Sequence, residues 1–300
     1  MVQVLFFNSN SLHFKKIIMK KINKYVFTFL VLSVTFFSCT DKKVIPEIIP
    51  AELVVDKNWQ FETTPVWQDD FNTGVAPDAT KWTFETGGSG WGNNELQYYT
   101  SGANSTVNGG NLNIVAKREP LLGRDYTSSR MITKGKGDWL YGRFEIKAKL
   151  PKGRGTWPAI WMLSSDNAYG NWPGSGEIDI MEHVGYDLNN VHFSIHTSAY
   201  NHTRGTQKST NKIIPDATDA FHIYRVDWTP YAVRGYIDGI SYFEFINNNT
   251  GFTAWPFNKP FHLILNTAVG GDWGGVQGID NTVFPATMQV DYVRVYKMIP

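Results

Sequence analysis

Three acidic residues fall within one short segment of the chain, residues 176–182 (GEIDIME). They alternate with apolar side chains in a β-rich neighbourhood, where charged residues are costly to bury without a functional reason. The period of two along a strand places Glu177 and Asp179 on one face, but it would place Glu182 on the other. If Met181 is an extra, bulged residue, the register shifts by one and Glu182 joins the other two acids.

A row of three carboxyl groups suits an enzyme that needs two of them in different protonation states on either side of a sugar bond. Glu177 and Glu182 would be the outer members, and side chains that lean inward could bring them to about 5–5.5 Å, the separation that accompanies nucleophilic attack and retention. Asp179 would raise the pKa of its neighbours and orient the nucleophile by a hydrogen bond. Two alternatives stay open: a Ca²⁺ site built from the three acids, and a solvated edge strand.

The elements that must position this row are short β segments separated by Gly, Asn and Pro. Such segments cover residues 111–117, 141–150, 236–242, 261–267 and 290–296, and the third of them contains an Asp-Gly hairpin turn. No amphipathic helix of three turns is expected after residue 58. This pattern predicts a single all-β domain, a sandwich or jelly roll, over residues 59–300.

The composition supports one sizeable core and argues against some classes of partner. Of the 300 residues, 42% are hydrophobic, and 11 are Trp, a residue that glycan-binding enzymes use as a flat platform for sugars. Residues 1–38 carry five Lys and no acid, and the rest of the chain carries 23 basic and 27 acidic side chains. A chain with this balance is not expected to bind nucleic acid.

The N-terminal part is expected to be a targeting segment. Met19 begins a basic stretch that is followed by a largely apolar stretch of 13 residues, 25–37, too short to span a bilayer comfortably. We therefore predict a signal peptide over residues 19–38 and an upstream extension over residues 1–18. Residues 39–58 are expected to be a tether.

Cys39 follows the apolar stretch directly and is the only cysteine. A small residue before a lone Cys resembles a bacterial lipoprotein signal, in which the Cys is lipidated. We expect an exported protein anchored to a bacterial (outer) membrane only through Cys39; the alternative is an ordinary secretory signal and a secreted protein. Without a second cysteine, the core must carry the fold without a disulfide.

The acidic segment resembles the signature of family 16 glycoside hydrolases in its bulged form. The resemblance implies that Glu177 is the nucleophile, that Asp179 assists and that Glu182 is the acid/base. Five further motifs occur in the same order as in that family: residues 90–99, 157–163, 169–173, 191–196 and 266–273. The implied fold is a concanavalin-like β-jelly roll, two packed antiparallel sheets with a substrate cleft on the concave face.

Within the family, the segment at residues 91–95 and the bulged strand resemble endo-β-1,3-glucanases (laminarinases). The prediction is a monomeric, retaining endo-glycosidase that cuts β-1,3-glucan by double displacement. The alternatives are activity on mixed-linkage β-1,3-1,4-glucan or on a sulfated galactan and, from a different class, a non-catalytic glycan-binding module. Phe193 and Ser194 depart from the usual Gly-Thr of the family, and Phe193 is expected in the core.

The resemblance also implies a set of substrate-binding residues. Indole rings are expected to stack on sugars, Asn93 and Arg130 to bond glucose hydroxyls on the minus side, and His196 to reach the acid row, whereas His192 is expected to be an ordinary strand residue. Each indole could equally be part of the core, and Glu95 could order Asn93 or only cap its loop. The four indoles are Trp157, Trp161, Trp172 and, at the rim, Trp273.

No cofactor is expected for catalysis, but the resemblance implies a structural Ca²⁺ on the sheet face away from the cleft. Its ligands would be backbone carbonyls, that of Gly110 among them, and the carboxylate of Asp291. The alternative is that Asp291 is an exposed strand residue.

Overall fold

The computed structural model describes residues 53–300. The extension, the signal peptide and Cys39 lie outside these residues, as does the tether up to residue 52. In the described part of the chain, no helix has both the length and the apolar character needed to cross a membrane.

The described end of the expected tether, residues 53–58, forms no strand but contacts the domain. The backbone N–H of Val54 donates to Asn249 Oδ1 at 3.0 Å, and Asp56 Oδ2 pairs with Arg234 Nη2 at 2.8 Å. These contacts hold the segment against the loop after β17 (Ile240–Ile246) and against β16 (Ala232–Ile237).

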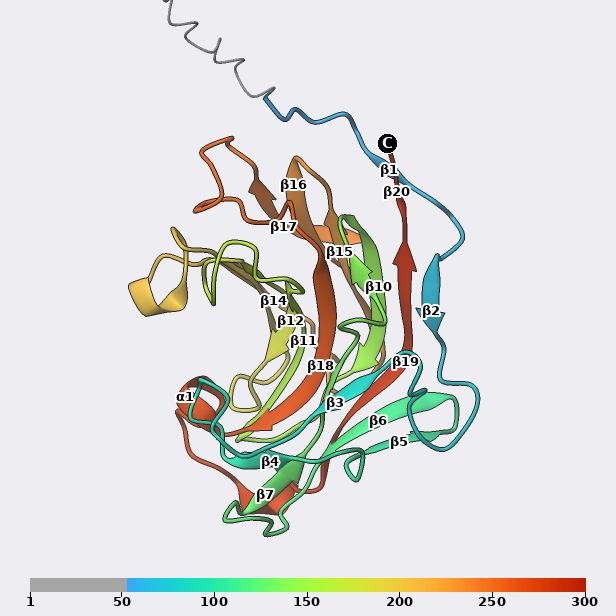
Figure 1. Cartoon of the computed structure of the whole chain (residues 1–300). Helices are drawn as coiled ribbons and strands as arrows, with labels where there is room; N and C mark the ends of the chain where they lie inside the picture. The colour runs from blue at the N-terminus through green and yellow to red at the C-terminus, as the bar shows by residue number, and fades with distance from the viewer. Residues whose placement is uncertain (1–52) are drawn as a thin grey trace, which may run out of the picture. The chain divides into compact units, whose positions relative to one another are not determined.

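Two eight-stranded antiparallel sheets pack against each other and form nearly all of the domain (Figure 1). The outer sheet contains, in spatial order, β17 (Ile240–Ile246), β16 (Ala232–Ile237), β15 (His222–Trp228), β10 (Gly142–Lys149), β19 (Ala286–Tyr296), β6 (Asn111–Ala116) and β5 (Ser105–Asn108), with β2 (Trp67–Asp69) also paired to β19. The cleft sheet contains β14 (Lys208–Ile213), β13 (Asn190–His196), β12 (Glu177–His183), β11 (Thr156–Ser164), β18 (Phe261–Val269), β8 (Arg130–Ile132) and β3 (Thr83–Glu85), with β9 (Asp138–Trp139) paired to β18.

The remaining elements are short. Two small sheets join β1 (Gln60–Phe61) to β20 (Met298–Ile299) and β4 (Gln97–Tyr99) to β7 (Tyr126–Ser128). The helical elements of the described residues are α1 (Gly271–Gly274), η1 (His202–Arg204) and η2 (Asn281–Val283). The expectation of an all-β domain built from two sheets and lacking a three-turn helix is therefore confirmed.

The core lies between the two sheets and follows the expected alternation. In β10, Phe144, Ile146 and Ala148 are fully buried, and the residues between them are only partly buried. Phe193 of β13 is also fully buried, as expected, and stacks on Phe243 with ring centroids 4.4 Å apart. The core thus covers one face of the cleft sheet, and the opposite face lies on the concave side of its curve (Figure 1).

The turn between β16 and β17 has the backbone geometry that its Asp-Gly sequence predicts. Asp238 and Gly239 both have positive φ angles, 50° and 80°, which a two-residue hairpin of this kind requires. The expected Asp-Gly hairpin is therefore confirmed.

Candidate active site

A β-bulge in β12 determines which residues of this strand share a face. Asp179 pairs with Ser194 on the neighbouring strand β13. Glu182 pairs with His192, which leaves a single residue of β13, Phe193, between the two pairs. Two residues of β12 therefore face one residue of β13, which is the definition of a bulge.

The two bulged residues are Ile180 and Met181, which are 1% and 0% exposed. Both side chains point into the core, so Glu182 returns to the face of Asp179. The expectation of a bulge is confirmed, but its detail is corrected. Met181 keeps a partner on β11, Ile160, whereas Ile180 has none, and it is Ile180 that is extra in this register.

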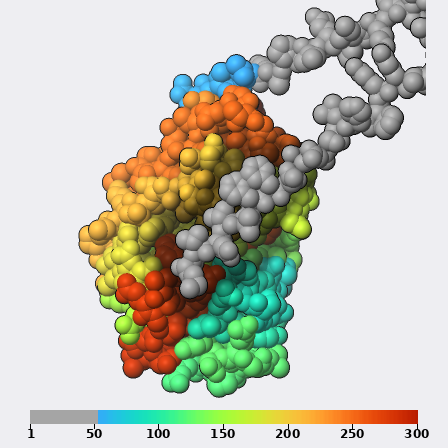
Figure 2. All heavy atoms as spheres, turned by 90° about the vertical axis from the view of Figure 1, so that its left-hand side faces the viewer, coloured from blue at the N-terminus to red at the C-terminus, as the bar shows by residue number. Residues whose placement is uncertain are grey.

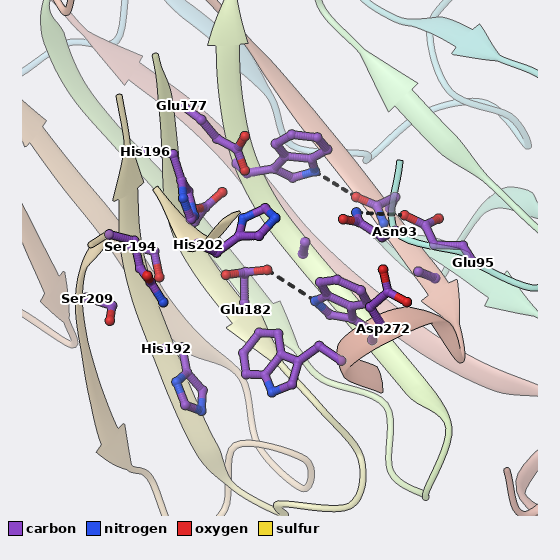
Figure 3. Close-up of a pocket in the computed structure, with 18 residues that line it drawn as sticks. Asn93, Glu95, Glu177, Glu182, His192, Ser194, His196, His202, Ser209 and Asp272 are labelled. Atoms are coloured by element: carbon purple, nitrogen blue, oxygen red, sulfur yellow. Dashed lines mark hydrogen bonds and ion pairs between the residues drawn. The ribbon is translucent and has the colours of Figure 1, made fainter. Parts of the chain in front are cut away.

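The three acids line a cleft of about 410 Å³ on the concave side of the cleft sheet (Figure 3). Strands β11, β13 and β18 form its floor together with β12, and loops near residues 93, 202 and 272 form its rim. Figure 2 shows this side of the molecule, with the red segment that includes α1 beside the teal segment that includes β4. A backbone hydrogen bond of 2.7 Å from Asp272 N to Asn93 O joins these two parts of the rim.

Glu177 lies at one end of the acid row. Its Oε2 accepts a hydrogen bond from the indole N–H of Trp172. Burial raises the pKa of Glu177 well above its usual range, and the charge of Asp179 raises it further. The indole N–H and the nearby His196 act in the opposite direction, because both favour the ionised form.

Glu182 lies at the other end of the row and has a matching contact. Its Oε1 accepts a hydrogen bond of 3.1 Å from the indole N–H of Trp157. Burial, followed by the charge of Glu177, raises the pKa of Glu182 to about 7. A carboxyl group with this pKa keeps its proton at mildly acidic pH, as a general acid must.

Asp179 lies between them and is 2% exposed. Burial and the charge of Glu182 raise its pKa well above the usual range, and it is hydrogen-bonded to the carboxyl group of Glu177. Its Oδ2 lies 3.3 Å from Nε2 of His196, so His196 reaches the acid row as expected. Three carboxyl groups this close titrate as one system, in which the protons are shared.

Glu177, Asp179 and His196 can each offer one metal-ligating atom, and these atoms lie within 4.8 Å of one another. Within residues 53–300 no other group of three acidic, histidine or cysteine side chains comes as close. The hydrogen bonds that Glu177 makes to Trp172 and Asp179 give this cluster a sufficient role without an ion.

Asn93 lies in the cleft, as expected (Figure 3), and a hydrogen-bond chain connects it to the floor. Its amide donates to Glu95 at 3.3 Å, and Glu95 also accepts from Tyr99 OH at 3.0 Å. Tyr99 in turn accepts from Asn266, whose Oδ1 accepts from the indole of Trp161 at 2.7 Å. Glu95 therefore orders Asn93, the first of the two roles open to it.

Arg130 lies outside the main cleft, in a neighbouring cavity of about 150 Å³ that Trp172 also lines. Its guanidinium lies near the rings of Trp91 and Trp161, at 4.8 and 4.7 Å from their centroids. Its Nε pairs with Glu85 at 2.6 Å. Arg130 is 7% exposed, and its expected bond to glucose stays a prediction.

The predicted indoles form two groups at the two ends of the acid row. Trp157 packs edge-on against Trp273, which packs edge-on against His192 at 4.9 Å. His192 therefore lines the cleft beside Glu182 rather than being an ordinary strand residue, and the expectation for it is wrong. At the other end, Trp172 is 39% exposed and available for contact.

The proposed calcium ligands lie on the outer sheet. Asp291 is part of β19, and its carboxylate pairs with Lys147 Nζ at 2.7 Å. Gly110 directly precedes β6, a neighbour of β19, and has a φ of 75°. Because Lys147 already places a cation against Asp291, these residues fit a Ca²⁺ ion poorly without rearrangement.

The fold and the acid row define a glycoside hydrolase, and comparison with known proteins agrees. The family model described as "Glycosyl hydrolases family 16" matches residues 92–294. The chain belongs to glycosyl hydrolase family 16, and its two sheets form the jelly roll of that family.

The similar proteins include glucanases. A beta-glucanase of Rhodothermus marinus is 52% identical over 243 residues, which cover 78% of this chain and 85% of the relative. The X-ray structure of the laminarinase from Rhodothermus marinus has a TM-score of 0.79 at 50% identity and covers 81% of this chain and 99% of that one. A non-specific endo-beta-1,3(4)-glucanase from family GH16 has a TM-score of 0.75 at 45% identity, with 82% and 93% covered.

Proposed function

We propose that this chain is an endo-β-1,3-glucanase that hydrolyses internal linkages of laminarin-type glucan with retention of the anomeric configuration. The observation that carries the proposal is the acid row on the cleft floor, with Glu177 and Glu182 each held by one indole N–H. The names of the similar proteins, a beta-glucanase and a laminarinase, support the choice of substrate.

The first step forms a bond between Glu177 and the sugar. A carboxylate oxygen of Glu177 attacks the anomeric carbon, and the bond from that carbon to the glycosidic oxygen breaks. Glu182 gives its proton to the departing oxygen, so the leaving chain is released with a free hydroxyl. The pKa of about 7 keeps this proton on Glu182 until the oxygen develops charge.

The second step releases the sugar. Glu182, now ionised, takes a proton from water, and the water oxygen attacks the same carbon from the side that the leaving group vacated. The ester bond to Glu177 breaks, and both glutamates return to their starting states. Two inversions at one carbon give net retention.

Asp179 is proposed to hold a proton while Glu177 is ionised. It is the more deeply buried of the two and gains most from being neutral, whereas Trp172 favours the charged form of Glu177. The hydrogen bond between the two carboxyl groups raises the pKa of Glu177 and lowers that of Asp179, so the proton has to pass to Asp179 before Glu177 attacks.

The test is a Glu177→Gln variant assayed on laminarin, with the product anomers of the wild type followed by NMR. We expect the variant to lose at least about a thousandfold in kcat, since the nucleophile is removed, and the first products to have the β configuration. A variant with wild-type activity would refute the role of Glu177, and α products would refute retention.

A panel of laminarin, lichenan, curdlan and agarose separates the alternatives. The non-specific endo-beta-1,3(4)-glucanase among the similar structures makes mixed-linkage glucan the second candidate substrate. Release of sugar products from lichenan at the rate seen with laminarin would support mixed-linkage glucan as the substrate. Release of products from agarose would support a galactan as the substrate. Binding to glucan without any release would support a binding module, against which the three facing acids argue.

The same proposal covers location and assembly. We infer that the protein is exported and anchored through a lipid on Cys39, because the N-terminal sequence has the pattern of a lipoprotein signal. We also infer that it is a monomer. The mass of the mature N-terminal peptide tests the anchor, and an unmodified Cys39 would refute it. The structural Ca²⁺ at Asp291 stays a prediction, and metal analysis of the purified protein tests it.

A further inference from the structure

His202 stands out among the cleft residues, because it comes from a loop and not from a strand. It is the first residue of η1, in the connection between β13 and β14, and it is exposed. Figure 3 shows its ring in front of β12, in the space between Glu177 and Glu182. No sequence motif or chemical step described above uses this residue.

The ring of His202 has aromatic neighbours but no polar partner. Its centroid lies 5.0 Å from that of Trp172 and 5.2 Å from that of His196. Among the hydrogen bonds of residues 53–300, none is made by either ring nitrogen of His202. Both nitrogens are therefore free to bond a ligand in the cleft.

The loop holds this ring in place through a buried side chain next to it. Asn201 is 1% exposed, and its amide donates to Thr197 O at 3.0 Å. Its Oδ1 accepts from Thr203 Oγ1 at 2.7 Å, and its backbone N–H donates to Thr206 Oγ1 at 3.1 Å. A loop tied on both sides of His202 presents the ring in one position at little further entropic cost on binding.

The charge state of the ring suits a sugar. Burial and the nearby His196 lower the pKa of His202, so the imidazole is neutral where Glu182 still holds its proton. A neutral imidazole has one N–H donor and one acceptor, which match a hydroxyl that both accepts and donates. The adjacent Trp172 supplies an apolar surface for the same ring of the sugar.

We propose that His202 binds a hydroxyl group of the glucosyl unit that Glu177 attacks, and that His202 and Trp172, whose rings are in contact, form one wall beside this unit. This inference rests on the proposed function. It adds a binding residue supplied by a loop, whereas the acid row comes from a strand.

The test compares His202→Ala, His202→Gln and the wild type on laminarin. We expect His202→Ala to raise KM about five- to tenfold, the effect of one lost hydrogen bond, with kcat within about twofold. His202→Gln keeps a donor and an acceptor on a side chain of similar reach, so it should restore much of the loss. The thermal midpoints of both variants should match the wild type, because the ring is exposed and has no polar partner.

Arg204→Ala is the matched control, since Arg204 lies on the same loop and is exposed but does not line the cleft. A rise in KM equal to that of His202→Ala would show that the loop and not the ring matters, and would overturn the inference. An unchanged KM in His202→Ala would overturn it as well, and a lowered KM would show that the ring blocks the cleft. A wild type without activity on laminarin would instead refute the proposed function.

Discussion

Two indole N–H groups set the outer carboxyl groups of the acid row apart from ordinary glutamates. Trp172 donates to Glu177, and Trp157 donates to Glu182 at 3.1 Å. Each bond stabilises the ionised form of its carboxyl group, against the strong effect of burial. The protonation state of each of these two glutamates thus depends on a neighbouring Trp that contributes both an aromatic ring and a hydrogen bond.

A Trp157→Phe substitution separates these two contributions, because an aromatic ring, although a smaller one, stays and the N–H is lost. Loss of the bond raises the pKa of Glu182 above its value of about 7. The general acid then keeps its proton to higher pH, so the alkaline limb of the kcat profile should move to higher pH. Steady-state kinetics on laminarin between pH 4 and pH 10 measures the shift.

Trp273→Phe is the control for this experiment. Its ring packs against Trp157 in the same cleft, but its N–H does not donate to either glutamate. The control should leave the alkaline limb in place. An alkaline limb that moves to lower pH in Trp157→Phe would contradict the role of the N–H.

At this scale the sequence predicted the acids well and their surroundings only in part. The parity of β12 located Glu177, Asp179 and Glu182, because a strand has a fixed period. His192 was expected to be an ordinary strand residue, because no local pattern reveals that Trp273, far along the chain, packs against it. His202 carried no periodic signal at all, because it lies in a loop.

The bulge is the feature of β12 that makes the row functional. Ile180 and Met181 both face the core, and together they oppose only Phe193 of β13. The alternation of the segment predicted that one residue had to be extra. It could not say which one, because that depends on the register with β11, which is a tertiary property.

Two deletion variants test whether the number of residues between Asp179 and Glu182 determines the face of β12 on which Glu182 lies. Removing Met181 alone restores strict alternation and keeps Glu182 on the cleft face, so we expect measurable hydrolysis of laminarin. Removing Ile180 and Met181 together places Glu182 next to Asp179 and turns it to the opposite face. That variant should lose the roughly 10²–10⁴-fold contribution of an acid/base group.

Thermal midpoints of both deletion variants must accompany the assay, because a lost core side chain also costs stability. Equal losses of activity in two variants that remain folded would contradict the parity argument. A single deletion that unfolds the protein would show instead that Ile180 and Met181 are needed mainly for packing.

For the molecule as a whole, the buried acid row is a stability cost that function requires. The pKa of Glu182 is raised from 4.5 to about 7, so the folded state binds its proton more tightly than the unfolded state does. The resulting contribution to stability is complete below the unfolded pKa of 4.5 and is lost as pH rises through 7. Above pH 7 an ionised Glu182 destabilises the fold.

A Glu182→Gln variant should therefore unfold at a higher temperature than the wild type at pH 8, by a few degrees, and at nearly the same temperature at pH 5. Calorimetry at the two pH values measures the difference. Glu62→Gln, a substitution at an exposed glutamate, is the control and should leave the unfolding temperature with the same pH dependence as in the wild type. A Glu182→Gln midpoint below that of the wild type at pH 8 would contradict the idea.

At this largest scale the class of fold followed from the sequence, but the order of strands did not. Alternation and turn residues predicted many short strands, and the Asp238–Gly239 turn predicted one adjacent pair. The position of β19 in the middle of the outer sheet, between β10 and β6, depends on contacts between distant parts of the chain. No local sequence pattern predicts contacts between residues that lie far apart in the chain.

The central position of β19 also determines at which point of folding the outer sheet can form. Until residues 286–296 are in place, the outer sheet consists of two unconnected parts, one with β10 and the other with β5 and β6. A chain that lacks these residues cannot close this layer. Folding of the outer sheet thus depends on pairing between distant parts of the chain, and a protein rich in such long-range pairing is expected to fold slowly.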